Sequence, residues 1–163
     1  MAVGIEKRGL MRAVQARLGE EIRILQEAAD ATRLGATHPE SRPENDKDTR
    51  GLEASYLARG QAARVEQMTE AATRLRFLTL RDFGADDPID LSALVRLRVD
   101  EEPRWVFLVP VQGGLEIQLP EARIQLITPA APVGRSLIGR RQGEEFELRI
   151  GSALRLYEIE EVR

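Results

Sequence analysis

Five carboxylates lie close together in a polar segment between residues 37 and 61, which also contains two prolines. They are Glu40, Glu44, Asp46, Asp48 and Glu53. Carboxylates are hard oxygen ligands for divalent cations, and they also cap the first turns of helices. Spacing alone leaves both roles open, because Thr37 and Ser41 each precede a glutamate by three residues, as in a capping box.

The rest of the sequence contains no self-contained catalytic set. His38 is the only histidine, and the chain has no cysteine, which excludes disulfides and thiolate metal sites. No nucleophile, base and orienting group stand at a meaningful spacing. Gly113 and Gly114 indicate a turn and not a phosphate-binding loop. We therefore do not expect a self-contained hydrolase.

Two long helical patterns flank the acidic segment. The first runs from about Ile5 to Leu34, with apolar residues every three or four positions. The second begins near Asp48 or Thr49 and runs to about Leu78. Its predicted inward residues are Leu52, Tyr56, Ala63, Met68, Ala72 and Leu75. Their similar lengths predict an antiparallel coiled coil of roughly 30 residues per helix, about 45 Å long, with the carboxylates at its tip.

The periodicity changes near residue 80, which predicts a second domain. We assign residues 1–79 to the coiled-coil hairpin, 80–88 to a linker and 89–163 to a C-terminal domain. Short apolar runs separated by turns predict a small, mostly antiparallel sheet, and Val133 to Ile138 is predicted to form a short helix. The predicted strands lie near residues 94–99, 105–109, 115–119, 124–127, 145–150 and 154–159. The fold class is therefore α+β.

Composition narrows the possible partners. A net charge of -3 argues against non-specific duplex binding, which uses a strongly basic surface. Aromatic residues make up only 4% of the chain, so any core must be aliphatic. The first residues contain no apolar run long enough for a signal peptide or a membrane span. These features predict a soluble, cytoplasmic protein without a membrane partner.

The C-terminal half contains a run that resembles a family signature. The run extends from Ile127 to Arg140 and is followed by Gly143 and by Tyr157-Glu158-Ile159. It resembles the Gre transcript-cleavage factors in the order and spacing of Pro132, Gly134, Leu137, Ile138 and Gly139. The start of the second helix is similar to the same family at Glu53, Tyr56, Ala58, Arg59 and Gln61.

This resemblance implies a coiled-coil arm followed by an FKBP-like domain. In the family, the domain docks at the rim of the secondary channel of bacterial RNA polymerase, and the arm carries tip carboxylates to the catalytic magnesium. The implied partners are bacterial RNA polymerase and the nascent RNA in its channel, with no small-molecule substrate. The implied cofactor is Mg²⁺, shared with the polymerase and not held by the isolated chain. Pro132, Val133 and Gly134 are assigned to polymerase binding by the same resemblance.

The tip departs from the family pattern. Active members carry an aspartate and a glutamate three residues apart just before the aromatic residue of the second helix. Here Lys47 and Arg50 interrupt the carboxylates that precede Tyr56. We assign Asp46 and Asp48 as the metal-facing catalytic candidates, because they lie at the turn; the next candidates are Glu53 and Glu44. An alternative is an arm that occupies the channel and inhibits the polymerase without cleaving RNA.

Two other functions remain open. An FKBP-like sheet is compatible with a prolyl isomerase or chaperone, although fold analogy is weak support and few aromatic residues are available to line a prolyl pocket. The hairpin is also compatible with a coiled-coil adaptor that binds another protein.

Overall fold

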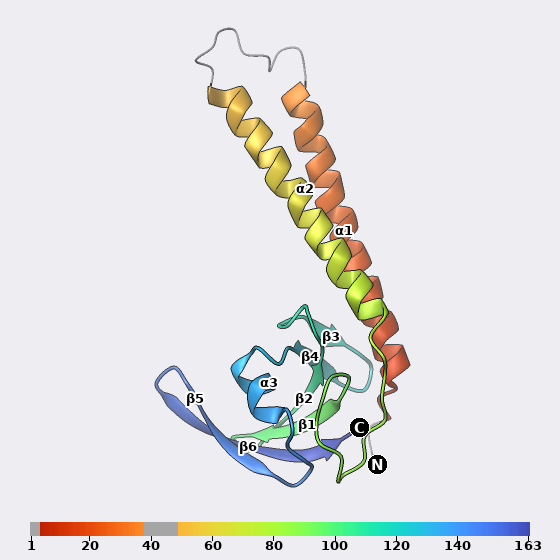
Figure 1. The fold of residues 1–163 in the computed structure, drawn as a ribbon, viewed down its shortest axis with the longest axis vertical. Helices are drawn as coiled ribbons and strands as arrows, with labels where there is room; N and C mark the ends of the chain where they lie inside the picture. The colour runs from red at the N-terminus through yellow and green to blue at the C-terminus, as the bar shows by residue number, and fades with distance from the viewer. Residues whose placement is uncertain (1–3, 38–48) are drawn as a thin grey trace. The chain divides into compact units, whose positions relative to one another are not determined.

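The computed structural model describes residues 4–37 and 49–163. Within these residues, two long helices are followed by a sheet of six strands and one short helix (Figure 1). The chain divides into two compact units: Gln15–Thr73, and Met1–Val14 together with Arg74–Arg163. This order of elements confirms the predicted α+β fold class.

The two predicted helices are present. Helix α1 spans Lys7–Thr37 and helix α2 spans Thr49–Arg76. They run antiparallel side by side (Figure 1), and the side-chain amide of Gln15 donates a hydrogen bond to the carbonyl oxygen of Ala72, 3.1 Å away. Among the described residues, neither helix has the length and apolarity that crossing a membrane requires.

Apart from the buried Ala71, the less exposed positions of α2 alternate in steps of three and four residues, which is the spacing of a coiled-coil seam. These positions are Gly51, Ala54, Ala58, Gln61, Val65, Met68, Ala72 and Leu75. In the first three turns the seam consists of glycine and alanine only. Such small residues allow two helix backbones to approach closely.

The predicted inward face of α2 is correct in its second half and wrong in its first. Met68, Ala72 and Leu75 are shielded from solvent as expected. Leu52 and Tyr56, in contrast, are 56% and 60% exposed, and Ala63 is also exposed. The prediction followed the largest apolar side chains, whereas the packed face in these turns is made by the smallest ones.

The six strands form one sheet in the order β3-β4-β2-β1-β6-β5. Strands β1 and β2 form the first hairpin, and β5 and β6 form the last. The strand bounds are Leu94–Val99 for β1, Glu102–Leu108 for β2, Glu116–Gln118 for β3, Arg123–Ile127 for β4, Glu145–Ile150 for β5 and Ala153–Val162 for β6. All six lie close to the predicted strands.

The sheet is mixed and mostly antiparallel, which agrees with the prediction of a mostly antiparallel sheet. Strand β4 pairs with β2 in parallel, with Trp105 opposite Ile124. Strand β3 pairs antiparallel with β4 at the sheet edge, with Ile117 opposite Ile124. After β2, the chain therefore first forms β3 at the edge of the sheet. It then returns as β4, which lies between β3 and β2. The remaining pairings are antiparallel.

The hydrophobic core lies between the sheet and the segments that cover one of its faces. It includes Val95 and Leu97 from β1, Leu137 from the short helix α3 (Pro132–Leu137), and Phe83 and Ile89 from the stretch that follows α2. Phe83, which lies in the predicted linker 80–88, thus contributes a buried side chain to the core. This stretch belongs to the same compact unit as the sheet.

Candidate functional site

Of the four predicted catalytic carboxylates, one, Glu53, lies within the described residues. Glu44, Asp46 and Asp48 lie outside the described residues, whereas Glu53 lies in the second turn of α2 and is exposed to solvent. Within residues 4–37 and 49–163, no group of three or more histidine, aspartate or glutamate side chains could hold a metal ion. The assignment of Asp46 and Asp48 to Mg²⁺ therefore stays a prediction, and Glu53 is open to a second molecule.

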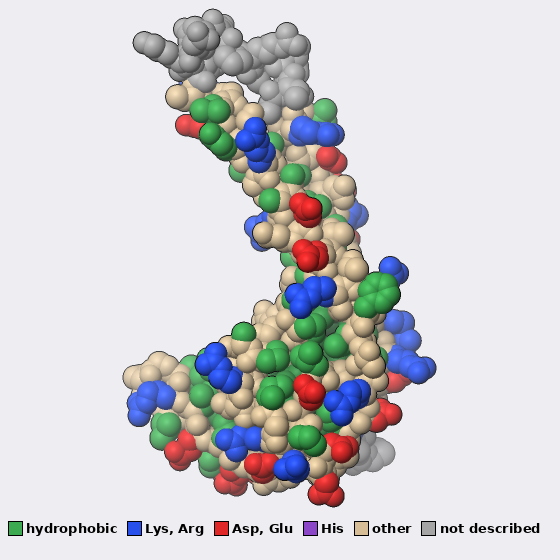
Figure 2. All heavy atoms as spheres, viewed as in Figure 1, with side chains coloured by type: hydrophobic (Ala, Val, Ile, Leu, Met, Phe, Trp, Pro, Cys, Tyr) green, Lys and Arg blue, Asp and Glu red, His purple; other side chains and the backbone are tan. Residues whose placement is uncertain are grey.

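Exposed apolar side chains surround Glu53. Leu52, Tyr56 and Leu57 are 56%, 60% and 57% exposed, and hydrophobic side chains are visible at this end of α2 in Figure 2. We call Leu52, Glu53, Tyr56 and Leu57 the α2 start surface. The helices pack through the alanine-rich side of α2. The side chains of the α2 start surface lie outside this packed side and are available for contact with a partner.

The predicted polymerase-binding residues lie in α3, at its N-terminal end. Pro132 is the first helical residue, where a missing N–H costs nothing. Val133 packs partly against the core. Gly134 is buried, and a Cβ there would lie 2.0 Å from the carbonyl oxygen of Thr128. Gly134 therefore keeps α3 close to the preceding backbone, and its role in binding a partner stays a prediction.

The other matched residues also maintain the fold. Leu137 is fully buried, and Gly139 has a φ of +82°, which favours glycine. The N–H of Gly139 donates to the carbonyl oxygen of Ile89, and the N–H of Ile89 donates to that of Arg140. Ile138 differs because it is 37% exposed. Ile138 and Pro132 are therefore the apolar signature residues of this segment that are exposed to solvent.

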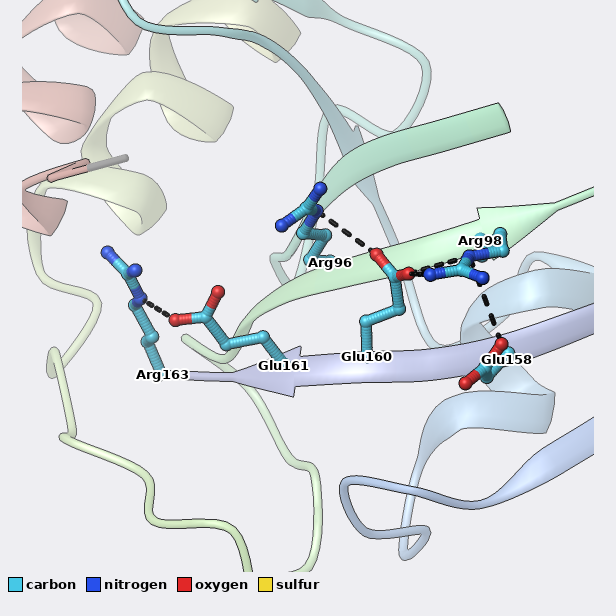
Figure 3. Close-up of polar contacts among 6 residues, drawn as sticks. All are labelled: Arg96, Arg98, Glu158, Glu160, Glu161 and Arg163. Carbon is cyan, nitrogen blue, oxygen red and sulfur yellow. Dashed lines mark hydrogen bonds and ion pairs between the residues drawn. The ribbon is translucent and has the colours of Figure 1, made fainter. Parts of the chain in front are cut away.

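A cluster of charged side chains crosses β1 and β6 (Figure 3). We call Arg96, Arg98, Glu158 and Glu160 the charged ladder. Arg96 Nε lies 3.1 Å from Glu160 Oε2, and Arg98 Nε donates to Glu160 Oε1 over 2.7 Å. Arg98 Nε also lies 3.9 Å from Glu158 Oε2. Only 13% of the Glu160 side chain is exposed, so two guanidinium groups largely enclose this carboxylate.

A β-bulge creates this arrangement. The register between β1 and β6 shifts between Arg96, which faces Glu161, and Leu97, which faces Ile159. Glu160 is the extra residue, and its side chain reaches both arginines. The hydrogen bond and then the charge of Glu160, followed by the charge of Glu158, raise the pKa of Arg98.

The sequence prediction did not include the charged ladder, although a signal was present. Arginine recurs every second residue in β1 and glutamate every second residue in β6. Opposite charges at this period are typical of cross-strand pairs. The pairing itself joins residues about 60 positions apart, which the local pattern does not reveal.

Similarity to known proteins identifies the relatives of this chain. No protein-family model matches it. The transcription elongation factor GreA of Nitrosococcus oceani is 35% identical over 66 residues, which cover 40% of this chain and 37% of that protein. GreA of a Sulfurovum species is 26% identical over 169 residues, which cover 97% of this chain and 95% of that protein. The chain is Gre-like.

Solved structures similar to this Gre-like chain include GreA factor homolog 1 (Gfh1) of Thermus thermophilus, at 17% identity and a TM-score of 0.38, covering 91% of this chain and 94% of that one. Gfh1 of Thermus aquaticus is 22% identical with a TM-score of 0.40, covering 93% and 94%. A GreA/GreB factor from Nitrosomonas europaea is also 22% identical, with a TM-score of 0.36, covering 72% and 94%.

Proposed function

We propose that this Gre-like chain is a transcription elongation factor that binds bacterial RNA polymerase. The observation that supports this most directly is the similarity to a transcription elongation factor, GreA, over 97% of the chain. The aligned length includes both the helical hairpin and the sheet. In this proposal the hairpin enters the secondary channel of the polymerase, and the region of Pro132, Val133 and Gly134 contacts the rim.

The hairpin would deliver carboxylates to the polymerase active site. Asp46 and Asp48 are the proposed metal-facing residues, with Glu53 and Glu44 near them. These carboxylates would hold a Mg²⁺ ion shared with the polymerase, and the chemistry that such an ion would supply is the activation of water for hydrolysis of the RNA phosphodiester. The exposed carboxylate of Glu53 can reach a second protein without unpacking the hairpin. The chain completes a site in the polymerase and is not an enzyme alone.

One observation favours a second candidate function, which is inhibition by occupancy of the channel. The α2 start surface contains three exposed apolar side chains around one carboxylate. Apolar contact with a channel wall contributes to binding through burial and does not require metal coordination. In this alternative the hairpin slows elongation without shortening the RNA.

An experiment with stalled elongation complexes and labelled RNA separates the two functions. The wild-type chain is compared with Asp46→Asn/Asp48→Asn, with Leu52→Ser/Tyr56→Ser, and with Glu66→Gln/Glu70→Gln as a control of equal charge change on α2. Cleavage predicts shortened transcripts that disappear only in the aspartate variant. Occupancy predicts slower extension without shortening, retained in the aspartate variant and lost in the Leu52/Tyr56 variant. If none of these proteins changes the length or the rate of extension of the RNA, both proposed functions are contradicted.

A further inference from the structure

Strand β5 (Glu145–Ile150) forms one edge of the six-stranded sheet (Figure 1). It pairs with β6 on one side, and within the described residues no strand pairs with its other side. An edge strand presents a row of backbone N–H and C=O groups that a further strand can bind. The opposite edge is formed by β3, which has three residues, whereas β5 has six. Strand β5 is therefore the longer of the two edge strands.

The hydrogen-bond alternation of the β5–β6 pair shows which backbone groups of β5 point outward. Ile150 and Ala153 flank a two-residue turn, and residues in this position exchange hydrogen bonds with each other. Every second residue before Ile150 is then also directed to β6. The N–H of Ile159 donates to the carbonyl oxygen of Glu144, which continues the same series. The outward-directed backbone groups are therefore those of Glu145, Glu147 and Arg149.

The same three residues are the charged residues of β5. Because successive side chains of a strand point to opposite faces, all three lie on one face, and all three are exposed. The residues directly opposite Glu147 and Arg149 on β6 are Leu156 and Leu154. Strand β6 thus offers neither of them an opposite charge across the ladder, and both charges are available to a strand on the open side.

Charge selects one register for an identical strand placed antiparallel at this edge. Outward-directed residues must face each other, so the possible registers differ by two residues. One register places Glu147 opposite Glu147 of the second copy, and another places Arg149 opposite Arg149. Like charges directly opposite each other are destabilising. The register between these two is centred on Leu148, and it places Glu147 of each copy opposite Arg149 of the other.

The apolar face of β5 fits the same register. Leu148 lies opposite Leu148 of the second copy, and Phe146 lies opposite Ile150. Leu148 is partly buried against the core of its own sheet, and Ile150 is 43% exposed. Cross-strand pairs of aromatic and β-branched side chains stabilise a sheet. The register that pairs opposite charges on one face therefore pairs apolar side chains on the other.

We propose that the outer edge of β5 binds a second copy of this chain, so that two six-stranded sheets join into one continuous sheet about a two-fold axis. A two-fold interface uses the same patch on both copies, so each charge pair occurs twice. The order of charges along β5 is complementary to itself, which favours a second copy over an unrelated strand. This self-association does not depend on polymerase binding.

The test is sedimentation velocity of the intact chain alone. The concentration is varied from about 1 µM to about 1 mM, because one pair of strands makes a small interface, and small interfaces bind weakly. We expect the sedimentation coefficient to rise with concentration from the value of a monomer to that of a dimer. A chain that stays monomeric at every concentration overturns the proposal and leaves the edge open to a strand of another protein.

Charge reversal tests the register. Arg149→Glu replaces both pairs of opposite charges by pairs of like charges, so the dissociation constant should rise about tenfold or more, and Glu147→Arg should do the same. The double variant Glu147→Arg/Arg149→Glu restores two pairs of opposite charges and should dimerise about as well as the wild type. Arg64→Glu, an equal reversal at an exposed position of α2, is the control and should leave the dissociation constant unchanged.

These exchanges should leave the single chain folded, because Glu147 and Arg149 are exposed and their backbone groups do not bond to β6. Circular dichroism of dilute samples checks this. Loss of the dimer in each single variant and its return in the double variant support the register centred on Leu148. A dimer that Arg149→Glu leaves intact, or a double variant that stays monomeric, overturns it.

Discussion

At the scale of single residues, the backbone position of Gly134 leaves no room for a Cβ atom. A Cβ would lie 2.0 Å from the carbonyl oxygen and 2.8 Å from the carbonyl carbon of Thr128, and both are backbone atoms. We expect Gly134→Ala to lower the free energy of unfolding by about 3 kcal/mol, because the backbone of α3 must shift. Urea denaturation followed by circular dichroism measures this change.

The same exchange at Gly60 is the control. Gly60 lies in α2, is exposed, and has nothing within 4 Å of the position that a Cβ would take. Gly60→Ala should stabilise the chain by up to about 1 kcal/mol, since alanine is the better helix former. A Gly134→Ala chain as stable as the wild type would contradict the close approach of α3 to Thr128.

Lys7 gives the stability of the chain a dependence on pH. Its pKa is about 8 in the folded chain and 10.5 for an ordinary lysine, so between these values the unfolded chain binds more protons. The free energy of unfolding should therefore rise with pH across this window. The charged groups nearest Lys7 are Glu6, Arg8, Arg81, Asp82 and Arg163.

The measurement is urea denaturation of the wild type and of Lys7→Met between pH 7.5 and 9.5. The wild type should gain stability relative to the variant as the pH rises, because burial disfavours the charged amine that the variant lacks. Parallel curves for the two proteins would show that Lys7 keeps an ordinary pKa in the folded chain.

At the scale of elements, the seam of α2 is tested by two matched alanines. Ala58 lies on the seam, whereas Ala63 is exposed. Ala58→Glu should destabilise the hairpin by about 1 to 3 kcal/mol, because it places a charge between two helices. Ala63→Glu should change the stability by less than about 0.5 kcal/mol. Thermal denaturation followed at 222 nm compares them, and equal losses would place the seam elsewhere.

The charged ladder makes a similar prediction for the sheet. Glu160→Gln removes the negative charge that two arginines share, and we expect a loss of about 1 to 2 kcal/mol. Glu147→Gln on strand β5 makes the same chemical change at an exposed position and should have little effect. The loss should shrink in 1 M salt, which screens ion pairs. A salt-independent loss would point to packing as its cause.

At the scale of the whole molecule, the order of elements could be predicted because it depends on local periodicity. The change near residue 80 from helical spacing to short alternating runs gave the α+β class. Two features depend on distant residues and were missed. The parallel pairing of β2 with β4 requires β3 to lie at the edge, and Glu160 requires a bulge to face Arg96 and Arg98.

The candidate site was predictable only in part, for related reasons. Resemblance located the segment around Gly134 and Leu137, but burial shows that both residues hold α3 in place. Tyr56 was predicted to pack in the seam and is exposed, because a seam of small residues leaves large ones outside. Lys7 gave no sequence signal, since desolvation of its amine arises only when the stretch containing Phe83 packs beside α1.

The measurement that tests the central claim most directly is binding to bacterial core RNA polymerase. The chain has no cysteine, so Glu121→Cys in the exposed turn after β3 accepts one fluorescent label. Titration with core polymerase should raise the fluorescence anisotropy to a plateau, and unlabelled GreA should reverse the rise by competing for the same site. An anisotropy that stays flat, or a rise that excess GreA leaves unchanged, would contradict a polymerase-binding role for this Gre-like chain.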